Sequence, residues 1–374
     1  MPRAVAWCFD LGLAIILTTV GWAPGIAATP HAAQIFVTDL KNNRIVRIND
    51  MAWTGWITFG SSGKGRNQFS NPTGIAVTAG RIFVVDSDNH RIVRINDMTG
   101  IGWTTFGRRG RGVSTSYGYV GTEVNEFYRP RGIAVTATGQ IFVTDILTHR
   151  IVRINDMTGT GWTTFGSFGK GKNQFNNPSS IAVTPAGQIF VTDAGNARIV
   201  RIDDMTGTGW TTFGTDGRGV NQFVNPAGIA VTAAGQIFIS DGLVSRIVRI
   251  NDMAGAGWTS FATGGREANQ FAAPVGIAVT DAGRIFVADL GNARIVRIND
   301  MTGAGWMTFA PKAPGPTSLT ILGASLSGNQ AATRTRTLTR SMGLRKGSAP
   351  AIRLAHLWWA RSWPSAKTLA SRMA

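Results

Sequence analysis

The feature that most constrains this chain is a sixfold internal repeat. A phrase close to IFVTD, four variable residues, RIVRINDM and GWTTFG begins at Ile35, Ile82, Ile141, Ile189, Ile237 and Ile285. The steps between these starting points are 47, 59, 48, 48 and 48 residues. A fixed period of this length is typical of folds in which one supersecondary unit is repeated and neighbouring units bury a shared core. Residues that serve a ligand are therefore expected where the copies differ.

One unit, residues 173–214, contains four short strand signals. They are SSIAVT at 179–184, QIFVTD at 188–193, RIVRI at 198–202 and GWTTF at 209–213. Gly, Pro and Asn-Asp pairs separate such runs, as expected for short antiparallel strands. Four-stranded antiparallel sheets repeated radially form a β-propeller. We predict an all-β, six-bladed propeller over residues 34–309, with the second to fourth strands of each blade at 35–59, 82–106, 141–165, 189–213, 237–261 and 285–309.

The unit also carries a specific signature. In the second copy it consists of Phe69, Pro72, Gly74-Ile75-Ala76-Val77, Asp86, Asn89 and Arg91. This pattern resembles the NHL repeat family of six-bladed propellers, and the resemblance covers about residues 34 to 309. The period and the lack of a Gly-His…Trp-Asp pattern distinguish it from a WD40 propeller.

An aspartate and an arginine five residues later recur in every copy. The pairs are Asp39 and Arg44, Asp86 and Arg91, Asp145 and Arg150, Asp193 and Arg198, Asp241 and Arg246, and Asp289 and Arg294. Six equivalent carboxylates could form a metal-binding ring. Their presence in every blade instead favours a structural role, in which the Asp caps its turn and meets the Arg. We expect the repeated tryptophans, Trp56 through Trp306, to pack between blades.

Variation between the copies singles out one face of the ring. The four residues between Asp and Arg read LKNN, SDNH, ILTH, AGNA, GLVS and LGNA. The resemblance implies that these loops share a face with the connections between blades, which carry Lys64, Arg66, Lys170, Lys172, Arg218 and Arg266. Because binding residues concentrate on loops held by a rigid scaffold, we predict that this face binds a ligand.

An eleven-residue insertion between the second and third blades is the largest departure from the repeat. FGRRGRGVSTSYGYVGTEVNEF at 106–127 replaces the FGSFGKGKNQF of the next copy. It contributes Arg108, Arg109, Arg111, Tyr117, Tyr119, Glu123 and Glu126. Tyr and Arg are frequent anchors of recognition surfaces. These residues, with Lys64, Lys170 and Lys172, form our predicted binding site, and a solvated loop without a ligand is the alternative.

Catalysis finds little support in the sequence. Related six-bladed propellers include a zinc-dependent amidating lyase and metal-dependent lactonases, and a zinc site needs about three converging ligands. The ring offers only His90 and His149, at equivalent positions in adjacent blades, where they suit turns. We predict a non-catalytic binding scaffold without cofactor or metal, whose ligand is a protein, a glycan or a small molecule. A metal-dependent lyase or lactonase is the alternative.

The formal charge of +17 is unevenly distributed. Lys312 and nine Lys or Arg residues from Arg334 to Arg372 supply +10, and no Asp or Glu follows Asp300. The high net charge of the chain therefore comes mainly from the C-terminal segment, and the ring is less basic than the total suggests. Some propellers of this family bind RNA, and basic loops suit that role. Outside the insertion, however, the loops lack stacking aromatic residues, so an RNA-binding face ranks third and we expect no nucleic-acid partner.

Residues 1–28 predict a secretory signal peptide. Arg3 precedes the apolar run LGLAIILTTVGWA at 11–23, and the small residues Ala27-Ala28 follow it. Asp10 interrupts the pattern, and a partly buried N-terminal segment is the alternative. The only cysteine, Cys8, lies here, so the chain has no internal disulfide framework. We expect a secreted or periplasmic monomer with no transmembrane span after removal of the signal.

Residues 310–374 do not continue the repeat. One interpretation is a basic, non-repetitive tail. The other is a shifted reading frame, in which each codon combines the third base of one residue's codon with the first two bases of the next. Residues 317–327 can then encode Gln-Phe-Asn-Asp-Pro-Trp-Gly-Ile-Ala-Val, and the junction of Pro316 and Thr317 gives a preceding Asn. The first blade also lacks an evident innermost strand. We expect it from 316–322 or from 24–30, because an open ring would leave a strand edge unpaired.

Overall fold

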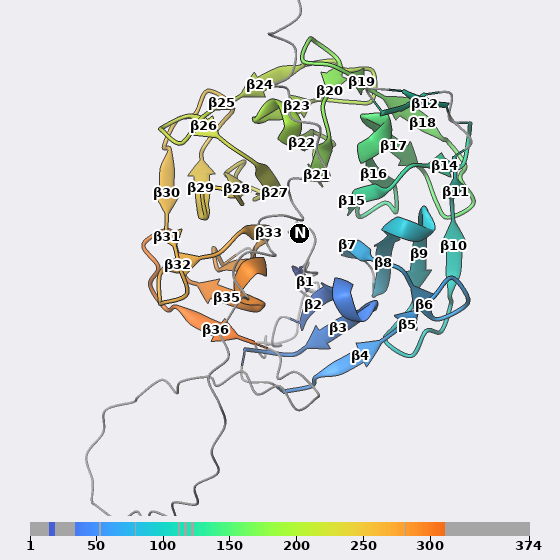
Figure 1. The fold of residues 1–374 in the computed structure, drawn as a ribbon, viewed down its shortest axis with the longest axis horizontal. Helices are drawn as coiled ribbons and strands as arrows, with labels where there is room; N and C mark the ends of the chain where they lie inside the picture. Colours follow the sequence, from blue (N-terminus) through green and yellow to red (C-terminus); the bar gives the residue numbers. More distant parts are fainter. Residues whose placement is uncertain are drawn as a thin grey trace, which may run out of the picture. The chain divides into compact units, whose positions relative to one another are not determined.

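The computed structural model describes residues 34–51, 54–78, 80–110, 123–280 and 282–310, and the backbone of 15–18, 113–115 and 118–120. All of them belong to one compact unit, Met1–Thr317. Six four-stranded antiparallel sheets surround a central axis in this unit (Figure 1). The predicted all-β, six-bladed propeller is thereby confirmed. Over the residues described, the fold holds no helix of the length and apolar character needed to cross a membrane.

Each blade runs from an inner to an outer strand. The first contains β1 (Ile15–Thr18), β2 (Gln34–Asp39), β3 (Arg44–Ile48) and β4 (Ile57–Phe59). The second contains β7 (Pro72–Thr78), β8 (Arg81–Asp86), β9 (Arg91–Ile95) and β10 (Thr104–Phe106). The third contains β15 (Pro130–Val135), β16 (Ile141–Asp145), β17 (Arg150–Ile154) and β18 (Thr163–Phe165).

The remaining blades repeat this plan. The fourth contains β21 (Pro178–Val183), β22 (Ile189–Asp193), β23 (Arg198–Ile202) and β24 (Thr211–Phe213). The fifth contains β27 (Pro226–Val231), β28 (Ile237–Asp241), β29 (Arg246–Ile250) and β30 (Thr259–Phe261). The sixth contains β33 (Pro274–Val279), β34 (Ile285–Asp289), β35 (Arg294–Ile298) and β36 (Met307–Phe309).

The strand sequences explain the sheets. The two middle strands of a blade, such as β22 and β23, pair from Ile189 opposite Ile202 to Asp193 opposite Arg198. Their Ile, Val and Phe side chains are buried on both faces of the sheet because each blade packs between two others. β-Branched and aromatic residues favour this buried, pleated environment.

Aromatic side chains fill the junctions between blades. At five junctions, a fully buried phenylalanine from the connecting loop packs between the last Phe of one blade and the Trp of the next. These junction phenylalanines are Phe69, Phe127, Phe175, Phe223 and Phe271. For Phe223, the ring centroids of Phe213 and Trp258 lie 6.1 and 5.5 Å away. Offset and edge-on aromatic contacts at such distances are favourable.

The loops between blades are held by short parallel bridges. Their bounds are β5 (Ser61–Ser62) with β6 (Gln68–Phe69), β11 (Arg108–Arg109) with β14 (Glu126–Phe127), β19 (Ser167–Phe168) with β20 (Gln174–Phe175), β25 (Thr215–Asp216) with β26 (Gln222–Phe223), and β31 (Thr263–Gly264) with β32 (Gln270–Phe271). Between β11 and β14, the insertion forms a hairpin of β12 (Val113–Thr115) and β13 (Gly118–Val120).

The strand order places two kinds of loop on each face. The turns after the second strands and the connections between blades leave the same ends of the strands. Most of these turns are 3-10 helices: η1 (Leu40–Asn42), η2 (Ser87–Asn89), η3 (Ile146–Thr148), η4 (Ala194–Asn196) and η5 (Leu290–Asn292). We call this side of the ring the loop face. The remaining turns, including the Asn-Asp turns, lie on the opposite face.

The first blade obtains its innermost strand from an unexpected segment. β1 (Ile15–Thr18) pairs with β2 from Ile15 opposite Val37 to Thr18 opposite Gln34. The two predicted sources, 316–322 and 24–30, lie outside the described residues, and the strand comes from neither. Sequence reasoning missed it because IILT has none of the Pro-x-Gly-Ile-Ala-Val pattern of the other inner strands.

Candidate functional site

In every blade the recurring Asp contacts the Arg five residues later. The N–O distances are 2.8 Å for Asp39–Arg44, 2.8 Å for Asp86–Arg91, 3.3 Å for Asp145–Arg150, 2.7 Å for Asp193–Arg198, 3.2 Å for Asp241–Arg246 and 2.7 Å for Asp289–Arg294. The Asp is the last residue of the second strand and the Arg is the first residue of the third. Because these two positions lie opposite each other in the strand register, the side chains meet. Each carboxylate is thus occupied within its own blade.

The same arginines build the loops between blades. Arg198 donates from Nη1 to the Lys170 carbonyl at 2.7 Å and from Nη2 to the Gln174 carbonyl at 2.8 Å. Its guanidinium also lies over Trp210, 5.6 Å from the ring centre. Since the loop is held through its backbone, the side chain of Lys170 remains exposed. The equivalent contacts of Arg91, Arg246 and Arg294 leave Lys64, Arg218 and Arg266 exposed in the same way.

His90 and His149 each connect two blades. Both adopt a left-handed conformation at the end of a 3-10 turn, with φ of 55° and 54°. His90 Nδ1 accepts a hydrogen bond from the Arg129 N–H at 3.1 Å, and His149 Nδ1 accepts one from the Asn177 N–H at 3.0 Å. Asn43 Oδ1 does the same for the Asn71 N–H at 2.9 Å. In the neutral ring, the remaining proton of each histidine is therefore on Nε2.

Several cations of the loop face lie near enough to His90 to affect its pKa. Burial lowers the pKa of half-buried His90, and the nearby charges of Arg109, Arg129 and Lys64 lower it further, while Asp88 opposes them. Tyr128 is buried beside it, with ring centroids 6.0 Å apart in an edge-on arrangement. We call His90, Tyr128, Lys64, Arg109 and Arg129 the His90 cluster. It combines a neutral imidazole with three exposed positive charges, which suits an anionic group.

One ion pair crosses the edge of this cluster. Arg129 Nη2 lies 3.3 Å from Asp88 Oδ1, and both side chains are more than two-fifths exposed. Water screens such a pair, so it contributes little energy and can exchange for a ligand contact.

The structure brings together only part of the predicted site. Arg108 and Arg109 form β11, and Arg108 Nη2 lies 3.2 Å from Oε1 of fully buried Glu126. Glu126 Oε2 accepts a hydrogen bond from the N–H of exposed Glu123 at 3.1 Å. Glu126 therefore belongs to the base of the insertion.

The other predicted residues lie apart from this base. Arg111 and Tyr117 lie outside the described residues, and for Tyr119 the backbone in β13 is described, which lies beside η3. Lys170 and Lys172 are exposed on the next junction, and Lys64 belongs to the His90 cluster.

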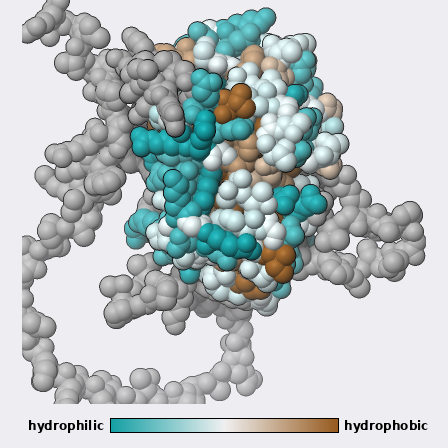
Figure 2. Space-filling view, turned by 90° about the vertical axis from the view of Figure 1, so that its right-hand side faces the viewer, coloured by the Kyte–Doolittle hydropathy of each residue, from teal (hydrophilic) through white to brown (hydrophobic). Residues whose placement is uncertain are grey.

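The two faces of the ring differ in charge. Exposed cations on the loop face are Lys41, Lys64, Arg66, Arg108, Arg109, Arg129, Lys170, Lys172, Arg218 and Arg266, with the exposed acids Asp88, Glu123, Asp216 and Glu267. Over the described residues, the opposite face carries the exposed acids Asp97, Asp156, Asp204, Asp252 and Asp300, with the exposed cations Arg81 and Arg284. Hydrogen bonds from Thr99 lower the pKa of Asp97. Hydrophilic residues gather toward the left edge of Figure 2, the side turned to the viewer in Figure 1.

Metal ligands are not assembled in the part of the chain that the structure describes. No group of three or more His, Cys, Asp or Glu side chains is placed there to hold a metal ion.

Sequence reasoning missed the roles of His90, Tyr128 and Arg129. The available signal was the last residue of the variable turn, which is Asn43, His90 or His149 in three consecutive blades. Each of these side chains has an acceptor atom, whereas Ala197 and Ala293 have none.

Comparisons with known proteins agree with this architecture. A sequence profile described as NHL repeat matches residues 69–95, 175–202 and 271–298. Among curated proteins, no sequence matches the chain. Virginiamycin B lyase from Staphylococcus aureus is a similar structure, with a TM-score of 0.50 and 17% identity over 77% of this chain and 84% of that one.

A structure of a nidogen/laminin complex is also similar, with a TM-score of 0.53 and 19% identity over 72% of this chain and 91% of that one. At these identities the likeness concerns the fold alone. The repeats and the six sheets make this chain an NHL-repeat, six-bladed β-propeller.

Proposed function

We propose that the protein is a non-catalytic binding scaffold that recognises an anionic ligand on its loop face. The observation that carries this proposal is the His90 cluster, in which the exposed side chains of Lys64, Arg109 and Arg129 lie near enough to half-buried His90 for their charges to lower its pKa. Tyr128 supplies an apolar wall beside it. The backbone of this region is fixed by the Arg91 and His90 hydrogen bonds, so a ligand meets a preformed surface.

The propeller fold alone does not distinguish an enzyme from a binding protein, so the residues of the site must decide. A lyase and a protein found in a complex with laminin both have similar structures. In this chain, the buried carboxylates are committed to arginine partners and the exposed groups of the His90 cluster are mainly cationic. That composition supports binding of an anion. Export, predicted from residues 1–28, is part of the same proposal.

Retention on immobilised heparin, used as a soluble polyanion probe, tests the proposal. We expect the double variant Lys64→Ser/Arg109→Ser to elute at clearly lower salt than the native chain, because it removes two charges of the cluster. Arg81→Ser/Arg284→Ser, which removes two charges from the opposite face, is the matched control. Arg345→Ser/Lys346→Ser controls for the basic C-terminal segment. Unchanged elution of the cluster variant, or an equal loss in either control, would contradict the proposal. Stoichiometric zinc or calcium in the purified protein would instead favour a metal-dependent lyase.

A further inference from the structure

Five blade junctions share one construction. At the junction of the first and second blades, the ring centroid of Phe69 lies 6.2 Å from that of Phe59 and 5.4 Å from that of Trp103. The Phe69 side chain is fully buried. The other four junctions repeat this arrangement with similar distances. A junction therefore consists of a site with defined walls and a phenylalanine that enters it.

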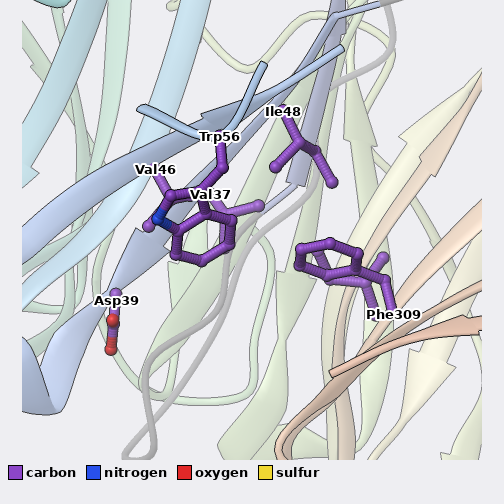
Figure 3. A pocket seen from close by; sticks show the side chains of 7 residues that line it. Val37, Asp39, Val46, Ile48, Trp56 and Phe309 are labelled. Carbon is purple, nitrogen blue, oxygen red and sulfur yellow. The ribbon is translucent and has the colours of Figure 1, made fainter. Parts of the chain in front are cut away.

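The junction between the sixth and first blades, which we call the seam, has the same walls. An apolar pocket there is lined by Val37, Asp39, Val46, Ile48, Trp56, Ile295 and Phe309 (Figure 3). In the repeat register, Val37, Val46 and Trp56 correspond to Val84, Val93 and Trp103. Phe309 corresponds to Phe59. The Trp56 and Phe309 rings stack at 5.6 Å and 27°, whereas those of Phe59 and Trp103 lie 6.1 Å apart at 56°.

The polar edge of the seam also differs from the other junctions. Asp86 and Asp289 each accept, at 2.6 Å, a hydrogen bond from the N–H of the residue that follows the junction phenylalanine. Asn42 Nδ2 donates to both carboxylate oxygens of Asp39 at 2.9 Å, whereas the equivalent Asn89 and Asn292 donate to Oδ2 alone and leave Oδ1 to the backbone N–H. Its side chain is 13% exposed, whereas the equivalent aspartates are 0% exposed.

Arg44 gives the same indication. Arg91 and its equivalents donate to carbonyls of the loop between blades, as Arg91 Nη2 does to the Gln68 carbonyl at 2.9 Å. Over the described residues, Arg44 donates to Asp39 alone. Its side chain is 23% exposed, whereas Arg91 is 11% and Arg198 9% exposed. The aromatic walls of the seam and the Asp39–Arg44 pair therefore correspond to the residues that receive a connecting loop at the other junctions.

We propose that the seam is an acceptor site for an Asn-Gln-Phe-x-x-Pro segment, and that the shifted reading frame after Phe309 encodes this segment. Its phenylalanine enters the pocket between Trp56 and Phe309, the following N–H donates to Asp39, and its carbonyls accept from Arg44. The spacing agrees independently. The shifted-frame phenylalanine falls at position 319, ten residues after Phe309, as Phe69 follows Phe59 and Phe223 follows Phe213.

The same segment supplies an inner strand. In the second blade, Ile75, Ala76 and Val77 pair with Val84, Phe83 and Ile82 of β8. The backbone of β1 takes the equivalent places on β2, but β1 lies within the predicted signal peptide. Cleavage near residue 28 would remove it, and the shifted-frame Gly-Ile-Ala-Val would then complete the first blade.

The nucleotide sequence gives the first test. For the shifted codon to read TTT, Ser318 must be encoded by a codon ending in T and Leu319 by TTA or TTG. Any other codon at either position overturns the proposal.

Peptide binding to the full chain gives the second test. A fluorescein-labelled peptide with the sequence of residues 170–181, KGKNQFNNPSSI, is titrated and followed by fluorescence anisotropy. We expect saturable binding that weakens at least about tenfold when alanine replaces the phenylalanine, because that ring supplies most of the buried surface. A scrambled peptide is the control. Equal binding of the native and alanine peptides, or no binding of the native peptide, overturns the proposal.

The third test uses a chain in which residues after Phe309 are replaced by those of the shifted reading frame. In this chain the segment is covalently attached, so it avoids the loss of translational freedom that a free peptide suffers on binding. This chain should melt at higher temperature than the given chain, and alanine in place of the restored phenylalanine should abolish most of the gain. A gain that does not depend on that phenylalanine overturns the proposal.

Discussion

Arg108 and Glu126 form an ion pair across the base of the insertion, with Nη2 and Oε1 3.2 Å apart. The carboxylate is fully buried, whereas the arginine side chain is 62% exposed. In the other blades a glutamine occupies the place of Glu126, and Gln174 Oε1, for example, accepts the Gly171 N–H at 2.9 Å. The insertion therefore keeps the hydrogen bond of the repeat and adds a buried negative charge to it.

This arrangement predicts the outcome of a double-mutant cycle. Arg108→Ala removes the arginine charge that pairs with the buried carboxylate and should cost about 1–3 kcal/mol of unfolding free energy. Glu126→Gln retains an oxygen for the Glu123 N–H, so we expect a change below about 1 kcal/mol. The double variant should recover most of the Arg108→Ala loss. Urea denaturation measures all three, and an additive double variant would show that the pair is not coupled.

The junction phenylalanines should dominate the stability of the ring. Phe223→Ala removes a fully buried ring between Phe213 and Trp258, which should cost about 3–5 kcal/mol. Phe168→Ala is the matched control, because this ring is 39% exposed and contacts His149 at 4.9 Å; it should cost much less. Chemical denaturation compares the two, and similar losses would contradict the role assigned to the junction site.

Ala197→Asn should stabilise the protein. Ala197 adopts φ of 53°, a conformation that Asn tolerates better than Ala. In addition, Asn at the equivalent position 43 accepts the N–H of the next blade. The N–H at the corresponding place in the next blade is that of Asn225. Ala197 offers it no side-chain acceptor, and it donates to Asp241 at 2.9 Å. We expect a gain of about 0.5–1 kcal/mol in unfolding free energy. Ala197→Ser, with a shorter side chain, is the control, and a loss of stability in Ala197→Asn would contradict the prediction.

Asp145 should make stability depend on pH. Burial raises its pKa to about 6, from 3.8, against the opposing effect of Arg150. Asp193 receives a hydrogen bond from Asn196 Nδ2 at 2.8 Å, but the third blade has Thr148 at that position. Because the folded state holds this proton more tightly, the contribution is full below about pH 4 and is lost as pH rises through 6, amounting to about 3 kcal/mol.

The pH prediction is tested by unfolding the native protein, Asp145→Asn and Thr148→Asn between pH 4 and 7. The native protein should lose stability relative to Asp145→Asn across this range. Thr148→Asn should show a smaller loss, since the added amide favours the ionised carboxylate. Parallel curves for the native protein and Asp145→Asn would refute the raised pKa.

The fold could be predicted because its determinants are local and repeated. Ile189 to Asp193 and Arg198 to Ile202 alternate, end and turn in the same way six times, so each copy reinforces the others. β1 could not be predicted, because the backbone pairing of 15–18 depends on an open strand edge and not on a shared side-chain pattern.

The candidate site was only partly visible in the sequence. Lys64 and Arg109 stand out as exposed cations, but their proximity to His90, which accepts the Arg129 N–H, depends on how two blades pack. The binding role of these residues stays a prediction, as does that of Tyr119.

The hydrogen bonds of Asn43, His90 and His149 to the next blade have a mechanical consequence. They fasten the first four blades to one another in sequence, whereas Ala197 and Ala293 provide no side-chain acceptor at later junctions. The ring is therefore unequally resistant to opening along its circumference. Under tension or partial denaturation, the junctions that follow the fourth blade should open before those among the first four blades, so the part that carries the His90 cluster is the last to come apart.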